Sequence, residues 1–293
     1  AEYKKALAWI KEKCPEGVDI NPTPGMTYMR PVLSAKEKEE NWEFIAKMTC
    51  IIRDILKGNP KLAEMGWLEE SKGRNAVLGG FQGQRMWTDW LPNGDFTEAI
   101  MASSFDWNGK KAPFAFATEN DTLNGISMLF ATLLTGKAPC FHDVRTYWSP
   151  DAVKRVTGKE LTGRAKDGIM HLINSGACCV DACGEVKDER GNAVMKKWWE
   201  VTDEDIDTMM NATTWPYADL GYFRGGGYSS RFVTRAEMPA TMIRLNLIKG
   251  LGGYSDDFTR LFDSNGISVL LSFGIPTAIG LIAGPFGDQC FWQ

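Results

Sequence analysis

The sequence predicts an α/β unit followed by a β-rich α+β unit: a parallel sheet with flanking helices, then a mostly β second unit. Two observations predict this order. Short apolar runs alternate with helical patterns up to about Gly136, and beyond it shorter strand-like runs are separated by glycine-rich turns. A chain of 293 residues is long enough to form one large domain or two. We therefore expect one domain at 1–135 and a second at 136–293.

The first elements are helical. An amphipathic pattern over residues 1–13 predicts a helix, and the prolines and glycine between Val18 and Pro31 predict a loop after it. Ser34 and Glu37 have the spacing of a capping box, in which the two side chains satisfy backbone amides at a helix start. The helix that begins there should end near Gly58, where a Gly-Asn-Pro sequence follows.

Strands and helices then alternate. Ala76–Gly80 predicts a short buried strand, Gly94–Ala102 a helix, Pro113–Ala117 a second strand and Leu123–Leu134 an apolar helix. Alternation at this spacing is typical of a parallel sheet covered by helices. Ligands of such sheets bind at the carboxyl ends of the strands.

The second unit should contain mostly strands. Ser149 and Pro150 suit the cap and first turn of one helix, and a second helix is expected near Asp203–Met210. The expected strands are Gly168–Ile173, Met195–Glu200, Tyr222–Thr234 and Ala240–Leu247. The three glycines at 225–227 fit a tight turn better than a phosphate-binding loop, since no strand-to-helix context surrounds them.

Composition excludes some classes of function. A net charge of -4 and a pI near 5.4 leave no basic stripe for nucleic acid. The most apolar stretch, 267–286, is interrupted by glycine and proline, which argues against a membrane span. Seven cysteines form an odd set without a secretory signal, so we expect a cytoplasmic protein with free thiols. Only Cys178, Cys179 and Cys183 lie close in sequence, and a structural zinc site would need a second ligand pair.

Two acidic residues follow apolar, strand-like runs. Glu119 comes after Pro113–Ala117, and Asp143 comes after Ala138–Phe141. A carboxylate at the end of a buried strand can act as a general base or an oxygen ligand on a rigid support. Both residues could equally be solvated loop acids or helix caps, the commoner role of such acids.

Several longer segments carry a family resemblance. They are Gly80–Asp89 (GFQGQRMWTD), Ala117–Gly125 (ATENDTLNG), Asp143–Pro150 (DVRTYWSP), His171–Gly176 (HLINSG), Tyr222–Gly227 (YFRGGG) and Met238–Leu245 (MPATMIRL). In this order they resemble L-fucose isomerase, a manganese-dependent ketol isomerase that also converts D-arabinose to D-ribulose. The likeness runs from about Trp9 to Gly252. It implies a fragment that supplies the second α/β domain and an incomplete C-terminal domain.

The resemblance also implies a site and a reaction. Glu119 and Asp143 match the acids that bind Mn²⁺ and accept protons while L-fucose becomes L-fuculose through a cis-enediol. Gln82, Ser175 and Tyr222 fall at substrate-binding positions. The family forms hexamers whose sites borrow residues from a neighbouring subunit. A hydride shift is a competing ketol mechanism that the sequence does not exclude.

One expected ligand is missing. The family's third metal ligand is a histidine near the C-terminus, and this chain has only His142 and His171. His142 neighbours Asp143 in an expected strand, where adjacent side chains point to opposite faces. His171 fits a packed core position better than a ligand. From Gly253 onward the family pattern is lost, through divergence, a frame slip or truncation. The isolated chain would then lack a complete metal site. Two alternatives to L-fucose isomerisation stay open: a different preferred aldose, such as D-arabinose, and a non-catalytic sugar-binding or assembly fragment, which the missing ligand favours.

Overall fold

The computed structural model describes most of the chain. The described residues are 2–17, 33–81, 88, 90–174, 178–217, 225–235, 238, 240–247, 267–272, 279–282 and 288–292. Gln82, Ser175 and Tyr222, expected to bind substrate, lie outside them. Within these ranges, no helix combines the length and the apolar character that crossing a membrane requires.

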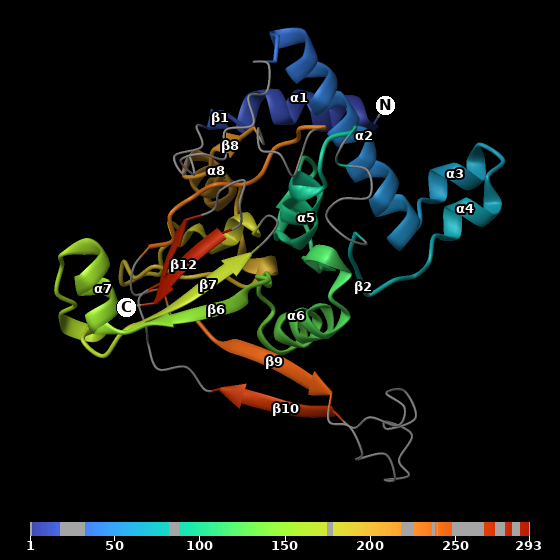
Figure 1. Ribbon diagram of the computed structural model, residues 1–293. Helices are drawn as coiled ribbons and strands as arrows, with labels where there is room; N and C mark the ends of the chain where they lie inside the picture. Colours follow the sequence, from blue (N-terminus) through green and yellow to red (C-terminus); the bar gives the residue numbers. More distant parts are fainter. Residues whose placement is uncertain are drawn as a thin grey trace, which may run out of the picture.

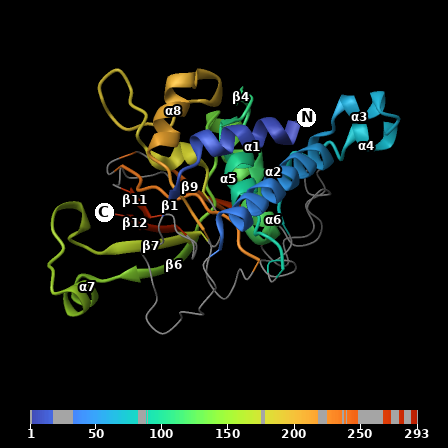
Figure 2. The ribbon, with the colours of Figure 1, turned by 90° about the horizontal axis from the view of Figure 1, so that it is seen from above.

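Two long helices form one end of the molecule (Figures 1 and 2). They are α1 (Glu2–Lys13) and α2 (Ala35–Lys57). The expected capping box starts α2: the Ser34 hydroxyl accepts from the Glu37 amide at 3.3 Å, and the Glu37 carboxylate accepts from the Ser34 amide at 2.7 Å. The helix ends at Gly58, whose φ of 82° favours glycine. Both helix predictions are confirmed.

Short elements connect the larger ones. Helices α3 (Pro60–Glu64) and α4 (Leu68–Lys72) form a small pair that extends away from the body in Figure 1. Strand β1 (Glu16–Gly17) pairs in parallel with β8 (Trp215–Pro216), and β3 (Phe105–Asp106) forms a hairpin with β4 (Gly109–Lys110). The β1–β8 pair joins the start of the chain to residues about 200 positions later.

The expected parallel α/β arrangement is present in a reduced form. Strand β2 (Leu78–Gly79) runs parallel to β5 (Ala115–Phe116), and helices α5 (Asp95–Ala102) and α6 (Thr122–Thr135) follow in the predicted order. In the described part of the chain, the sheet that contains β2 and β5 has no further strand. Strand β2 is half-buried, so the prediction of a buried strand there was wrong in degree.

The second part of the chain is mixed. Strand β6 (Asp143–Trp148) is antiparallel to β7 (Ile169–Asn174), and α7 (Pro150–Thr157), capped by Ser149 as expected, lies between them in sequence. Helix α8 (Asp203–Asn211) is also confirmed. The remaining strands are β9 (Met242–Leu247), which pairs with β10 (Ile267–Ser272), and β12 (Asp288–Trp292), which pairs with β7 and with β11 (Ile279–Ile282).

Two strand predictions were wrong. Residues 195–200 form a loop and one 3₁₀ turn at Trp198–Glu200, because the backbone is drawn to other parts of the chain: the Trp198 amide donates to the Gly136 carbonyl at 2.7 Å. The described residues 225–234 make only isolated bridges, such as Tyr217 with Tyr228, and no continuous strand. Gly226 and Gly227 have φ values of 86° and 112°, in agreement with a tight turn.

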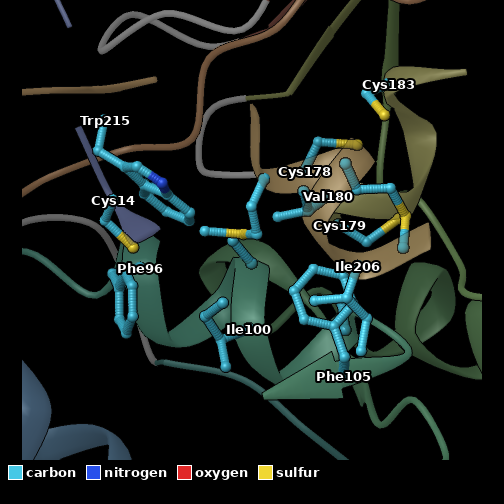
Figure 3. Packing of buried hydrophobic residues seen from close by; sticks show 14 of the residues in the cluster. Cys14, Phe96, Ile100, Phe105, Cys178, Cys179, Val180, Cys183, Ile206 and Trp215 are labelled. Carbon is cyan, nitrogen blue, oxygen red and sulfur yellow. The ribbon is translucent and has the colours of Figure 1, made fainter. Parts of the chain in front are cut away.

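One large hydrophobic cluster draws residues from both sides of position 136 (Figure 3). Phe96 and Phe105 from the first part are fully buried beside Val180 and Trp215 from the second. Phe96 and Trp215 have ring centroids 5.0 Å apart. Four cysteines labelled in Figure 3 belong to the same cluster: Cys14, Cys178, Cys179 and Cys183.

Candidate functional site

Glu119 stands in a turn directly after strand β5. The 3₁₀ turn Thr118–Asn120 separates this strand from α6, and Glu119 has φ 57° and ψ 14°. Asn120 is also left-handed, with φ 54°. A non-glycine residue in this region costs about 1–2 kcal/mol, and such strained positions concentrate at functional sites. The strained backbone presents the Glu119 side chain to solvent.

Several contacts hold this turn. The Asn120 amide donates to the Ala117 carbonyl at 3.2 Å, and the Asp121 carboxylate accepts from the Asn124 amide at 3.2 Å as the cap of α6. Gly80 passes so close that a Cβ there would lie 2.3 Å from the Ala117 oxygen. The turn is therefore clamped between the end of β2 and the start of α6.

Two buried carboxyl groups lie behind Glu119. The Thr118 hydroxyl donates to Glu98 Oε2 at 2.7 Å, and Glu98 is 5% exposed. Burial raises the pKa of Glu98 well above its ordinary value, and the neighbouring Asp95 and Glu119 raise it further. Burial also raises the pKa of Asp95 to about 7, although a hydrogen bond from the Ser229 hydroxyl acts in the opposite direction and lowers it. The sequence did not reveal this pair, because acids three apart on a helix usually mark a solvated face.

Asp143 occupies a different kind of position from the expected one. Residues 138–142 are irregular, and Asp143 begins strand β6, so the prediction that it follows a strand was wrong. Strand β6 pairs with β7 and belongs to another sheet than β5. Phe141 nevertheless packs in a small cluster with Ala115, Ala117 and Met128.

This small cluster brings the two acids into one neighbourhood. Ala117 is two residues before Glu119, and Phe141 is two residues before Asp143. Two residues span at most about 7 Å of extended chain, so both acid backbones lie within that reach of one cluster.

The two histidines take different places. His171 lies in β7, half-buried, with its ring centroid 6.2 Å from that of Trp148, which agrees with a packed sheet residue. His142 lies beside two thiols: the ligand atoms of Cys140, His142 and Cys178 are all within 4.8 Å of one another.

Cys140 also approaches a third thiol, with its Sγ 3.3 Å from that of Cys179. Hydrogen bonds from the Cys178 and Cys179 thiols hold the pKa of Cys140 well below its usual range. Cys140 is 38 positions before Cys178, so spacing along the sequence gave no signal for this cluster.

A short parallel strand pair with a helix after each strand is consistent with the class of α/β proteins. Two family models match the chain. The second N-terminal domain of L-fucose isomerase matches residues 1–136, and the C-terminal domain of L-fucose isomerase matches residues 172–257. The chain belongs to the L-fucose isomerase family.

Curated relatives agree with the family models. The chain is 63% identical over 254 residues to an L-fucose isomerase of Clostridium perfringens. The aligned segment covers 86% of this chain and 42% of that protein. It is 56% identical over 253 residues to an L-fucose isomerase of Phocaeicola vulgatus, with the same two shares. A Streptococcus pneumoniae L-fucose isomerase is 53% identical over 251 residues, and the aligned segment again covers 86% of this chain and 42% of the relative. The chain thus spans less than half the length of the curated relatives that it matches.

Proposed function

We propose that this chain is the part of an aldose–ketose isomerase that carries two metal-binding carboxylates, and that the whole protein converts L-fucose to L-fuculose. The observation that carries the proposal is 63% identity over 254 residues to a protein named L-fucose isomerase. The strained, exposed turn at Glu119 supports it, because this turn presents a carboxylate from a rigid base.

The donor set supports a hard divalent ion, and we propose Mn²⁺. Glu119 offers exposed carboxylate oxygens, and Asp143 would be the second oxygen ligand. Carboxylates suit magnesium, calcium and manganese better than soft ions. When bound, such an ion supplies Lewis acidity and a template for two neighbouring sugar oxygens. A histidine from a part of the whole protein that this chain does not include would complete the site, since both histidines of the chain, His142 and His171, take other places.

The protein side chains would move the proton. Aldose-to-ketose conversion removes a proton from C2 of the sugar and returns one to C1, with a cis-enediol between the two steps. Glu119 or Asp143 would accept the C2 proton and return it, and Gln82, Ser175 and Tyr222 would orient the sugar hydroxyls. Glu98 and Asp95 support this role, since their raised pKa values limit the negative charge beneath Glu119. D-Arabinose, converted to D-ribulose, would be a second substrate.

The setting of the enzyme is part of the proposal. Domains at 1–135 and 136–293 are supported by family-model matches on either side of residue 136. A cytoplasmic location is supported by six free thiols: Cys14, Cys50, Cys140, Cys178, Cys179 and Cys183. We also propose a homo-hexamer, in which neighbouring subunits complete each site.

Activity of the whole protein tests this function. L-Fucose and Mn²⁺ are supplied, and L-fuculose is measured by NMR. The wild type should produce L-fuculose, and Glu119→Gln should lower kcat by about 100-fold or more, the contribution typical of a positioned base. Glu43→Gln is the control, since Glu43 is a partly exposed helix residue paired with Lys47. Turnover that Glu119→Gln leaves unchanged would contradict the assignment.

A non-catalytic sugar-binding fragment is the second candidate. It is favoured by the position of His142 among thiols. Calorimetry of the 293-residue chain with L-fucose separates the two. Binding that depends neither on Mn²⁺ nor on Glu119 would support the binding fragment.

A further inference from the structure

Three side chains from distant parts of the sequence form a cluster that the proposed isomerase chemistry does not use. Cys140 and His142 come from the irregular segment before β6, and Cys178 comes from the loop before the 3₁₀ turn Val180–Cys183. Their ligand atoms lie within 4.8 Å of one another. We propose that Cys140, His142 and Cys178 form a binding site for a thiophilic d¹⁰ cation such as Zn²⁺.

The geometry is close to what zinc requires. Zn–S bonds of about 2.3 Å and Zn–N bonds of about 2.0 Å place tetrahedral ligand atoms roughly 3.5–3.8 Å apart. Separations of at most 4.8 Å therefore have to shrink by up to about 1.3 Å. Rotation of the Cys140 and His142 side chains can supply this movement, since both residues are only half-buried.

The third ligand is held rigidly. Cys178 is 1% exposed and belongs to the large hydrophobic cluster, near Cys179 and Val180 (Figure 3). The Ser230 hydroxyl donates to the Cys178 carbonyl at 3.0 Å, and the Val180 amide donates to the Ser103 hydroxyl at 2.9 Å. One fixed ligand and two adjustable ones allow a site to close around an ion without rearranging the core.

An ion can reach this cluster. Cys140 and His142 line a cavity of about 250 Å³ between α6 and the start of β9, and this cavity leaves room for water as the fourth ligand. Two thiolates and a neutral imidazole balance the charge of a divalent cation. Balance matters here because an unpaired charge beside a buried residue such as Cys178 is costly.

This site differs in chemistry from the carboxylate pair. Thiolate sulfur selects soft ions, whereas carboxylate oxygen selects hard ions such as manganese. The inference rests on the cysteine–histidine geometry alone and stands or falls independently of the isomerase proposal.

Cadmium binding to the reduced 293-residue chain tests the site. Cd²⁺ is added without oxygen, and the ultraviolet thiolate-to-metal charge-transfer band is followed. We expect one tight equivalent in the wild type. Cys140→Ala and Cys178→Ala should each weaken binding by about 10-fold or more, as losses around metal sites typically do. Cys183→Ala is the matched control: Cys183 is buried in the same cluster and is not one of the three ligands, so its variant should keep the band.

A measurement on the wild type keeps the test independent of how the variants fold. Iodoacetamide labelling with and without Cd²⁺, mapped by peptide mass spectrometry, should show that the metal protects the half-buried Cys140, whereas the buried Cys50 reacts equally slowly in both samples. Absence of the charge-transfer band, or protection spread evenly over all cysteines, would overturn the proposal. So would a Cys140–Cys179 disulfide in the protein as purified, because that bond would consume one of the three ligands.

Discussion

The buried carboxyl group of Asp95 should make the folded chain less stable as pH rises. Asp95 is 7% exposed at the start of α5, where the Ser229 hydroxyl donates to it. Burial raises its pKa from an ordinary 3.8 to about 7. The folded state therefore holds a proton that the unfolded chain releases earlier, and stability falls between pH 4 and pH 7.

The size of this effect follows from the two pKa values. Each pKa unit corresponds to about 1.4 kcal/mol, so ionised Asp95 costs the folded state up to about 4 kcal/mol above pH 7. Between pH 5 and pH 8 the loss should be about 2–3 kcal/mol. Part of this loss of stability acts through Glu98. Burial raises the pKa of Glu98, and the nearby Asp95 raises it further.

Asp95→Asn is the variant that isolates this contribution. The amide is similar in size, its oxygen can still accept from Ser229, and it does not ionise. Urea unfolding at pH 5 and pH 8, followed by tryptophan fluorescence, should give a much smaller difference for Asp95→Asn than for the wild type. The control Glu43→Gln removes a partly exposed acid whose pKa the hydrogen bond from Lys47 lowers, so it should keep the wild-type pH dependence between pH 5 and pH 8. Parallel pH profiles for Asp95→Asn and the wild type would refute the reasoning.

Three further substitutions follow from local contacts, each measured by urea unfolding. Ser34→Ala should cost about 1 kcal/mol, because the Glu37 amide loses its cap; an unchanged midpoint would contradict this. Glu2→Gln should cost about 1 kcal/mol at neutral pH. Hydrogen bonds to its carboxylate, led by that from Asn108, lower the pKa of Glu2 from 4.5 to about 2. The difference in stability between the wild type and Glu2→Gln should therefore vanish as pH falls through that interval. A difference that persists at low pH would contradict the assignment. Gly80→Ala should cost about 1–3 kcal/mol, since its Cβ would stand 2.3 Å from a backbone oxygen; full stability would show that the turn at Glu119 is not clamped.

Features encoded locally could be predicted from the sequence. The capping box at Ser34 fixes the start of α2 through two contacts within four residues, and Gly58 ends it through its own backbone freedom. Ser149 and Pro150 act in the same way for α7. The strand predicted at Met195–Glu200 is absent, although the sequence pattern there is typical of a strand. Its backbone groups form hydrogen bonds with distant parts of the chain instead, such as that from the Trp198 amide to the Gly136 carbonyl.

In the candidate site, too, features encoded by nearby residues could be predicted, whereas contacts between distant residues could not. The segment around Glu119 carried enough residues to indicate both the turn and its family, and the structure adds the left-handed backbone that exposes the carboxylate. Long-range neighbours could not be predicted. Glu98 is recognised as buried only once Thr118 is placed over it. Cys140 and Cys178 become a ligand pair only when the irregular segment before β6 meets the loop before the Val180–Cys183 turn.

Solvent deuterium incorporation tests the central claim most directly. The whole protein is supplied with L-fucose and Mn²⁺ in D₂O, and the L-fuculose formed is analysed by NMR. If Glu119 or Asp143 carries the proton between C2 and C1, deuterium should appear at C1, because the exposed Glu119 carboxyl group exchanges with water. Glu119→Gln should then lose both product and label. Rapid formation of L-fuculose without any deuterium at C1 would show a hydride shift, and would contradict the assignment of these carboxylates as proton carriers.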